Sequence, residues 1–227
     1  MTTYSPHVGT LREKPLHASL KQWCANDGDH FEVPVDGFVI DVVQDGLLIE
    51  IHTRGFSSMK RKLGELLAAG HRIRVVHPIP INKWVVRIDT DGEILGRRKS
   101  PKHGTVLDVF SELVSIPHLL AHPELELQIV LTHEDEYRQH DPTKAWRRKG
   151  WVVRERRLIS VEDVIDLRTV ADLAALLPES LPESFTTADL TTSAAIPRRL
   201  AQQMAYCLKH ADIITPTGKT GNAVEYS

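Results

Sequence analysis

Two Asp-Gly dipeptides constrain the fold of this chain more than any other feature of its sequence. Asp36-Gly37 and Asp45-Gly46 separate three runs that are rich in β-branched and aromatic residues. Asp-Gly is the strongest short signal of a β-hairpin, because both central positions of the favoured turn require a positive φ. The sequence therefore predicts a meander of three strands. The strands are expected at residues 30–35, 38–43 and 47–53.

Helical patterns flank this meander. Apolar residues recur at helical spacing over residues 12–25 and again over residues 56–69. A strand over residues 72–77 follows, which Pro78 is expected to close, and residues 84–88 form an edge strand. The order through residue 77 is helix, three strands, helix, strand, which predicts a mixed α/β (α+β) fold.

The second hairpin of the meander sets the register of two acidic residues. A two-residue loop pairs Gln44 with Leu47, and continuing that register places Asp41 opposite Glu50. Two carboxylates about 5 Å apart in an apolar hairpin repel each other unless a cation lies between them. Hard divalent ions such as Mg²⁺ are held by acid pairs of this kind. The alternative is that this face of the sheet is simply the solvated one.

These residues, in this order of elements, resemble the PD-(D/E)XK nuclease superfamily over roughly residues 10–90. In this resemblance Asp41 matches the first acid of the motif and Glu50 the second. His52 stands where the family usually has a lysine, and Glu13 matches an additional acid that many members carry on the first helix. The resemblance implies a restriction-endonuclease-like αβββαβ core and metal-dependent hydrolysis of phosphodiester bonds, in a bacterial DNA-processing setting.

The resemblance also implies roles for the site residues. Asp41, Glu50 and the carbonyl group of Ile51 would hold Mg²⁺ or Mn²⁺. The attacking water would be positioned by His52, or by Lys62 from the following helix, since some members supply the cation there. Either the cation has moved to the helix or catalysis has been lost.

The C-terminal part of the chain has the order of a winged helix. A Pro/Ser-rich segment at residues 178–184 is the expected domain boundary. A short helix with a threonine cap, a longer helix from Pro197 and a hairpin with a Gly-Lys-Thr-Gly tip follow it. The residues expected to contact DNA are Arg198, Arg199, Gln202, Lys209 and Lys219. Because residues 180–227 carry no net charge, docking to a protein is the alternative.

The central part contains a basic loop at residues 97–104, a polar loop at 133–141 and a basic cluster at 144–157. Trp146 and Trp151 are interleaved with the cluster, so a nucleic-acid track is one interpretation, with Arg147 and Arg148 as DNA contacts. The other interpretation is a solvated, charged strand whose tryptophans belong to the core.

The overall composition bounds the class of protein. Hydrophobic residues make up 41% of the 227 residues and charged residues 26%, which is enough to bury a core. The formal net charge of −2 excludes a histone-like protein. Without an apolar run of about 20 residues or a secretory signal, the sequence predicts a soluble, cytoplasmic protein without a membrane partner.

Three domains are expected. They are a nuclease-like core at residues 1–95, a mixed α/β extension at 96–177 and a winged helix at 178–227. The leading hypothesis is a metal-dependent nuclease that a winged helix places on DNA, with a homodimer needed for a double-strand cut. The alternatives are a catalytically inactive nucleic-acid-binding or regulatory protein and a protein-interaction module.

Overall fold

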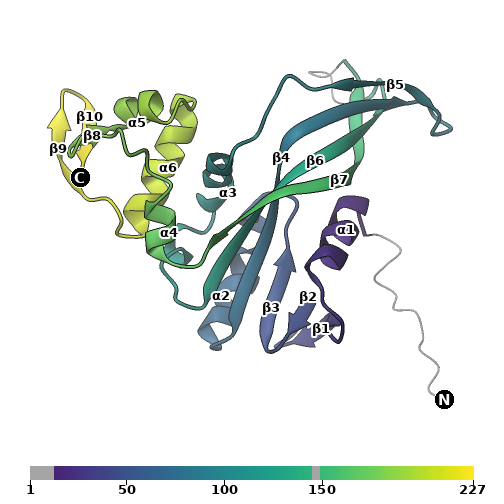
Figure 1. Ribbon diagram of the computed structural model, residues 1–227, viewed down its shortest axis with the longest axis horizontal. Helices are drawn as coiled ribbons and strands as arrows, with labels where there is room; N and C mark the ends of the chain where they lie inside the picture. The colour runs from purple at the N-terminus through teal and green to yellow at the C-terminus, as the bar shows by residue number, and fades with distance from the viewer. Residues whose placement is uncertain (1–12, 145–148) are drawn as a thin grey trace.

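The computed structural model describes residues 13–144 and 149–227. Its centre is a seven-stranded mixed sheet with the order β1-β2-β3-β4-β6-β7, and β5 pairs with β4 (Figure 1). The strands are β1 (His30–Val35), β2 (Phe38–Gln44), β3 (Leu47–Ile51), β4 (Arg72–Ile88), β5 (Ile94–Lys99), β6 (Leu125–His140) and β7 (Trp151–Leu167). The predicted mixed α/β class is therefore confirmed.

The two Asp-Gly turns form as expected and make β1, β2 and β3 an antiparallel meander. The backbone φ is 46° at Asp36 and 80° at Gly37, and 47° at Asp45 and 80° at Gly46. Positive φ at both central positions gives the turn the twist of the flanking strands. β3 then pairs in parallel with β4, and the crossover contains the 3₁₀ turn η2 (Phe56–Met59) and helix α2 (Lys60–Ala68).

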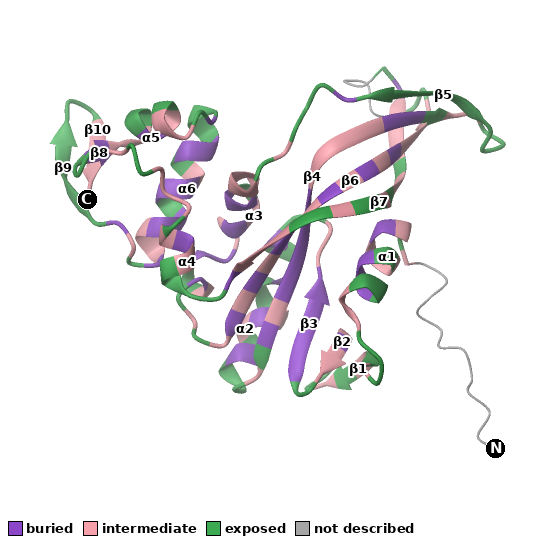
Figure 2. Cartoon of the chain, viewed as in Figure 1, coloured by how far each residue is buried: buried purple, intermediate pink, exposed green. Residues whose placement is uncertain are grey.

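Helices α1 (Pro15–Cys24) and α2 cover opposite faces of the meander. Leu16 and Leu20 of α1 share one buried cluster with Leu47, Ile49 and Ile51 of β3. The leucines of α2 belong to the other cluster, with Leu48 and with residues of β4 that face the same way. Every residue of β3 is buried (Figure 2), because both of its faces are covered.

Strand β4 is much longer than its sequence pattern indicates. It was expected as two strands, with Pro78 closing the first, but it runs from Arg72 to Ile88. The carbonyl oxygen of Val76 faces β3. Backbone groups of every second residue in a strand face the same neighbour, so those of Pro78 and Pro80 face this side too. β3 has ended there and β5 begins to pair only at Trp84, so the missing N–H groups remove no ladder bond on that side.

The predicted loops at 97–104 and 133–141 were also wrong in part. Residues 97–99 belong to β5, and residues 133–140 continue β6 between β4 and β7. These parts of the strands form an arm that projects beyond the helices (Figure 1). Its polar side chains bond across the strands, as Arg97 does with Asp135 at 2.9 Å and Lys83 with Glu136 at 3.0 Å. A polar sequence therefore forms strands here, because polar side-chain pairs across the strands stabilise them in place of a buried apolar face.

Short helices connect the sheet to the C-terminal lobe, which is defined here as residues 185–227. The connecting elements are η3 (Val106–Val109), α3 (Phe110–Leu113), η4 (Pro117–Leu119) and α4 (Val170–Ala174). The lobe contains β8 (Phe185–Thr186), α5 (Thr187–Ser193), α6 (Arg198–His210), β9 (Pro216–Thr220) and β10 (Ala223–Tyr226). The strands form a second sheet with the order β8-β10-β9.

The lobe and the sheet share one hydrophobic core. Met204 and Leu208 of α6 belong to the same buried cluster as Phe110 of α3 and Leu127 of β6. Residue 95, the expected first domain boundary, falls within β5, and the large sheet continues on both sides of it. The division into three domains stays a prediction.

None of the helices within residues 13–144 and 149–227 has the length and hydropathy that crossing a membrane requires.

Candidate active site

The strands β2 and β3 separate at the two acidic residues that the sequence singled out. The predicted register holds for Gln44–Leu47, Val43–Leu48 and Val42–Ile49. The ladder ends there, so the expected pairing of Asp41 with Glu50 is not made. Oδ2 of Asp41 instead accepts the backbone N–H of Ile51 at 2.8 Å. The side chain of Asp41, and not the backbone of β2, thus accepts the hydrogen bond from the Ile51 amide of β3, and the two strands diverge at this point.

Helix α1 supplies the side-chain partners of Asp41. Nε2 of His17 lies 3.2 Å from Oδ2 of Asp41, and Nδ1 of His17 lies 2.5 Å from Oε1 of Glu13. Burial works to lower the pKa of His17, but Asp41 and Glu13 outweigh it and raise that pKa above its ordinary value. Burial likewise works to raise the pKa of Asp41, but His17 and the Ile51 amide hold it below its ordinary value.

Lys21 extends this network along α1. Its Nζ lies 2.7 Å from Oε1 of Glu13 and also contacts Glu32 on β1, and Lys21 is buried. Glu13, His17 and Lys21 are spaced by one helical turn each, so their side chains line the same side of the chain. Sequence reasoning identified Glu13 but missed His17 and Lys21. The repeated spacing of four residues was the signal that could have found them.

Helix α2 supplies the partner of Glu50 from the opposite face of the sheet. Nζ of Lys62 lies 2.5 Å from Oε1 of Glu50 and donates to the carbonyl oxygen of Val39 at 2.6 Å. Glu50 is 7% exposed. Burial and the negative charge of Asp41 raise its pKa to about 7, and the charge of Lys62 works against this rise. The two acids therefore influence each other although they bond to different helices.

The side chain of His52 makes its hydrogen bond away from Asp41 and Glu50. Its Nε2 donates to the carbonyl oxygen of Gly55 at 2.9 Å, and its ring contacts Phe56 edge-on. The carbonyl oxygen of His52 accepts a hydrogen bond at 2.7 Å from Nδ1 of His77, a residue that the sequence did not single out. Burial lowers the pKa of His77 to about 4. Of the two cations considered for the site, Lys62 is the one that the structure brings to Glu50.

The metal-ligand prediction stays a prediction. Among the residues that the structure describes, no group of three or more His, Cys, Asp and Glu side chains is arranged as a metal site. A cavity of about 810 Å³ opens beyond the end of β3, and Thr53, Arg54, His77 and Arg156 are among its lining residues. Asp41, Glu50 and Lys62 are not among the residues that line this cavity.

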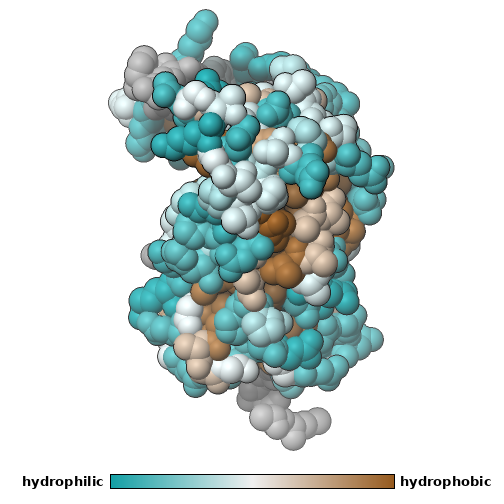
Figure 3. Space-filling model, turned by 90° about the vertical axis from the view of Figure 1, so that its left-hand side faces the viewer, coloured by the Kyte–Doolittle hydropathy of each residue, from teal (hydrophilic) through white to brown (hydrophobic). Residues whose placement is uncertain are grey.

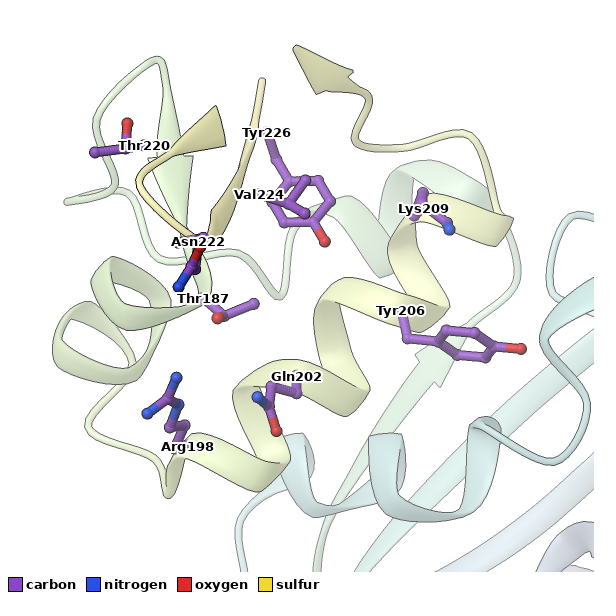
Figure 4. A pocket seen from close by; sticks show the side chains of 10 residues that line it. Thr187, Arg198, Gln202, Tyr206, Lys209, Thr220, Asn222, Val224 and Tyr226 are labelled. Atoms are coloured by element: carbon purple, nitrogen blue, oxygen red, sulfur yellow. The ribbon is translucent and has the colours of Figure 1, made fainter. Parts of the chain in front are cut away.

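The residues expected to contact DNA fall into three groups. Arg198, Gln202 and Lys209 line a second cavity, of about 570 Å³, between α6 and the β9–β10 hairpin (Figure 4). Arg199 and Lys219 are exposed outside this lining. Arg147 and Arg148, together with Trp146, lie outside the described residues.

The face of the molecule on which the C-terminal lobe lies is mostly hydrophilic (Figure 3). On the side of the molecule where the C-terminal lobe lies, polar residues surround an apolar area near the middle (Figure 3). On the arm, the guanidinium group of Arg87 lies 4.7 Å from the ring centre of Trp151, so one ring face is already covered by a cation.

Comparison with known proteins places the chain in a family. A family model described as a domain of unknown function (DUF8091) matches residues 14–168. The chain belongs to this family. The matched segment contains Asp41, Glu50 and Lys62 and ends before the C-terminal lobe. An uncharacterised protein of Treponema pallidum (strain Nichols) is 31% identical over 221 residues, which cover 96% of this chain and 86% of the relative. No solved structure matches the chain.

Proposed function

We propose that this chain hydrolyses phosphodiester bonds in DNA with the help of Mg²⁺ or Mn²⁺. The observation that carries the proposal is the pair of carboxylates at the divergence of β2 and β3, of which Asp41 is half-buried and Glu50 is buried. Asp41 is held ionised there, whereas Glu50 has a pKa of about 7 and a lysine from α2 against it. Acids whose pKa is perturbed by burial and by a specific neighbouring charge are typical of catalytic sites.

The arrangement of the secondary structure supports the same proposal. The order α1-β1-β2-β3-α2-β4, with an antiparallel meander and β3 parallel to β4, is the one expected for a PD-(D/E)XK core. The acids lie where the second and third strands separate. Lys62 then takes the place of the motif lysine that His52 replaces, because its ammonium group reaches Glu50 from α2.

The donor atoms at the site are of the kind that a hard divalent cation binds, although Asp41 and Glu50 bond to helices on opposite faces of the sheet, so one ion between them requires a carboxylate to leave its helix partner. Asp41 and Glu50 offer carboxylate oxygens, Ile51 offers a carbonyl oxygen, and the buried Oε1 of Glu50 has no hydrogen-bond donor apart from its ion contact with Lys62. Mg²⁺ is commonly bound by one or two carboxylates, with water and substrate phosphate completing its shell. Such an ion would polarise the phosphate and lower the pKa of a water.

The residues of the chain have separate tasks in this proposal. The Ile51 amide and His17 fix the orientation of the Asp41 carboxylate. Glu13 positions His17 from its other ring nitrogen. Lys62 provides positive charge beside Glu50, where it can orient a water or a phosphate oxygen.

The C-terminal lobe would bring the site to its substrate. We propose that α5, α6 and the β9–β10 hairpin act as a winged helix, with Arg198, Arg199, Gln202, Lys209 and Lys219 toward DNA. Cationic side chains on and beside α6 support this role, because phosphate neutralisation supplies much of the affinity for DNA.

Plasmid cleavage tests the proposal. Supercoiled DNA incubated with the full chain and Mg²⁺ or Mn²⁺ should be nicked or linearised, and EDTA should stop the reaction. Glu50→Gln should abolish cleavage, whereas Glu65→Gln, which changes an exposed acid on α2, should not. Cleavage that survives Glu50→Gln would assign the activity elsewhere.

A second candidate is a nucleic-acid-binding protein without catalysis. It is favoured by one observation: Asp41 and Glu50 are each already paired with a basic side chain, His17 and Lys62 respectively, within the chain. DNA binding without cleavage, with affinity that falls steeply with salt, would support this candidate. Absence of both binding and cleavage would leave the protein-interaction module.

A further inference from the structure

The cationic and acidic side chains of the C-terminal lobe occupy different places, although the four Lys and Arg residues and three Asp and Glu residues of 185–227 nearly balance. Arg198 and Lys209 line the cavity between α6 and the hairpin, and no acidic residue lines it. Asp189 lies elsewhere, where its carboxylate accepts the N–H of Thr186 and caps α5. Glu225 is not a lining residue, and its Oε1 accepts a hydrogen bond from the hydroxyl group of Thr220, which does line the cavity. The cavity is therefore lined by cationic and not by acidic side chains, in a lobe whose formal net charge is only +1.

Helix α6 forms one wall of this cavity. Arg198, Gln202, Tyr206 and Lys209 follow one another at helical spacing and form a single polar stripe. The opposite side of α6 is buried against the lobe and α3. Tyr206 remains 42% exposed, its ring and that of His210 meet edge-to-face with centroids 4.5 Å apart, and Nζ of Lys209 lies 6.0 Å from the Tyr206 ring centre.

The hairpin forms the facing wall. Asn222, Val224 and Tyr226 come from β10 and the turn before it, and Thr187 comes from the start of α5 (Figure 4). The polar stripe of α6 thus lies in a hollow between two elements rather than on a protruding ridge.

The chemistry of the lining matches the parts of a nucleotide. Arg198 and Lys209 are groups that bind phosphate. Tyr206 offers an aromatic surface on which a base can stack. Gln202 and Asn222 carry side-chain amides, which pair with the donor and acceptor edges of bases. The volume of about 570 Å³ falls within the range of roughly 300–1,000 Å³ that small ligands occupy.

We propose that this cavity binds a nucleotide whose base is unpaired, with the base on Tyr206 and its phosphate at Arg198 or Lys209. The inference rests on the proposed function, because it takes nucleic acid as the ligand of the C-terminal lobe. It specifies that lobe further, since it predicts a preference for single strands and strand ends over continuous duplex. A base inside a duplex has its faces covered by its neighbours and cannot stack on a tyrosine.

Fluorescence anisotropy on the full chain in EDTA tests the inference without requiring catalysis. The probes are a labelled 12-nucleotide single strand, a blunt duplex of the same length and thymidine 5′-monophosphate as competitor. The single strand should bind more tightly than the duplex. Tyr206→Leu should weaken it roughly 5- to 150-fold, as expected for one lost base–aromatic stack, and Tyr206→Phe should restore it. If the monophosphate competes with the labelled strand, the site binds a single nucleotide; if it does not compete, the site requires a strand.

Two arginines provide a matched comparison. Arg198 lines the cavity and the adjacent Arg199 does not, although both are exposed on α6. Arg198→Ala should therefore weaken single-strand binding more than Arg199→Ala. Arg72→Ala removes the same charge at the start of β4, outside the cavity lining, and is the control for nonspecific attraction.

The outcomes separate this inference from the proposed hydrolysis. Preference for duplex, with equal losses from Arg198→Ala and Arg199→Ala, would overturn the cavity proposal and leave a duplex-reading helix. Cleavage that depends on Glu50 while Tyr206→Leu binds normally would overturn the cavity proposal alone. Single-strand binding through Tyr206 without any metal-dependent cleavage would uphold the cavity and overturn hydrolysis. Neither binding nor cleavage would overturn both.

Discussion

The ammonium group of Lys62 lies 2.5 Å from Oε1 of Glu50 and 2.6 Å from the carbonyl oxygen of Val39. One side chain of α2 thereby contacts both strands at the point where they separate. Lys62 compensates the charge of a buried acid and holds the position of β2 against β3.

Replacing Lys62 with methionine should therefore destabilise the fold. The substitution leaves Glu50 buried without a cation, which costs about 1–3 kcal/mol because Lys62 is itself mostly shielded from solvent. Urea unfolding at pH 8 measures the change. Arg61→Met is the matched control, since Arg61 is exposed and its pair with Glu65 is worth less than about 1 kcal/mol. Equal effects of the two variants would contradict the role given to Lys62.

The raised pKa of Glu50 predicts a pH-dependent loss of stability. Between its ordinary value of 4.5 and about 7, the folded state binds more protons than the unfolded state, so the free energy of unfolding falls as pH rises. Glu50→Gln removes this contribution. The difference in stability between wild type and variant should change by about 3 kcal/mol across that range. Parallel profiles from urea titrations at several pH values would refute the raised pKa.

His77 should act in the opposite direction. Its pKa of about 4 lies below the ordinary 6.5, so the unfolded state protonates first and stability falls as pH drops from about 6.5 to 4. His77→Asn retains a side-chain donor toward the carbonyl oxygen of His52 but does not titrate. The variant should lose about 3 kcal/mol less than wild type on acidification. Acid unfolding followed by circular dichroism tests this, and it fails if the variant is as acid-sensitive as wild type.

Divalent cations should stabilise the protein through Glu50. For an ion with a dissociation constant of about 1 mM, 10 mM would add about 1.4 kcal/mol to stability. The shift in melting temperature should disappear with EDTA and in Glu50→Gln but persist in Glu65→Gln. Lys62→Met should bind the ion more tightly, because the ammonium group no longer competes for Oε1. An equal shift in wild type and Glu50→Gln would place the ion elsewhere.

Alanine substitutions at two glycines should change the free energy of unfolding in opposite directions. A Cβ at Gly104 would lie 2.7 Å from Cγ2 of Ile79 and 2.8 Å from the carbonyl oxygen of Pro80, so Gly104→Ala should cost about 1–3 kcal/mol. Gly64 lies within α2 with nothing within 4 Å of that position. Gly64→Ala should stabilise by about 0.5–1 kcal/mol through helix propensity. Thermal melts of both variants provide the measurement.

The local parts of the fold could be predicted from the sequence. The Asp-Gly turns and the helical spacing of leucines depend on neighbouring residues, and α1, α2 and the meander follow from them. The length of β4 and β6 could not be predicted in this way. The prolines of β4 are tolerated only because its neighbour changes from β3 to β5, and the polar part of β6 is held by partners distant in sequence.

The same distinction applies to the candidate site. The hairpin register predicted Asp41 and Glu50 as site residues. Lys62 was predicted because His52 stands where a lysine is usual and the following helix could supply that lysine. The end of the ladder at Val42–Ile49 could not be predicted, because it depends on the side chain of Asp41 capturing the amide of Ile51. His77 was missed because its contact with His52 requires the parallel pairing of β3 with β4.

The uninterrupted course of β4 has a mechanical consequence. Val75 of this strand pairs with Glu50 on β3, and Arg87 of the same strand lies on the outer arm against Trp151. β6 runs beside β4 over nearly its whole length, with one register shift between Pro80 and Asn82. The same two paired strands therefore form both the arm and the sheet next to Glu50, so a change in the twist of the arm can reach the neighbour of that acid through continuous backbone.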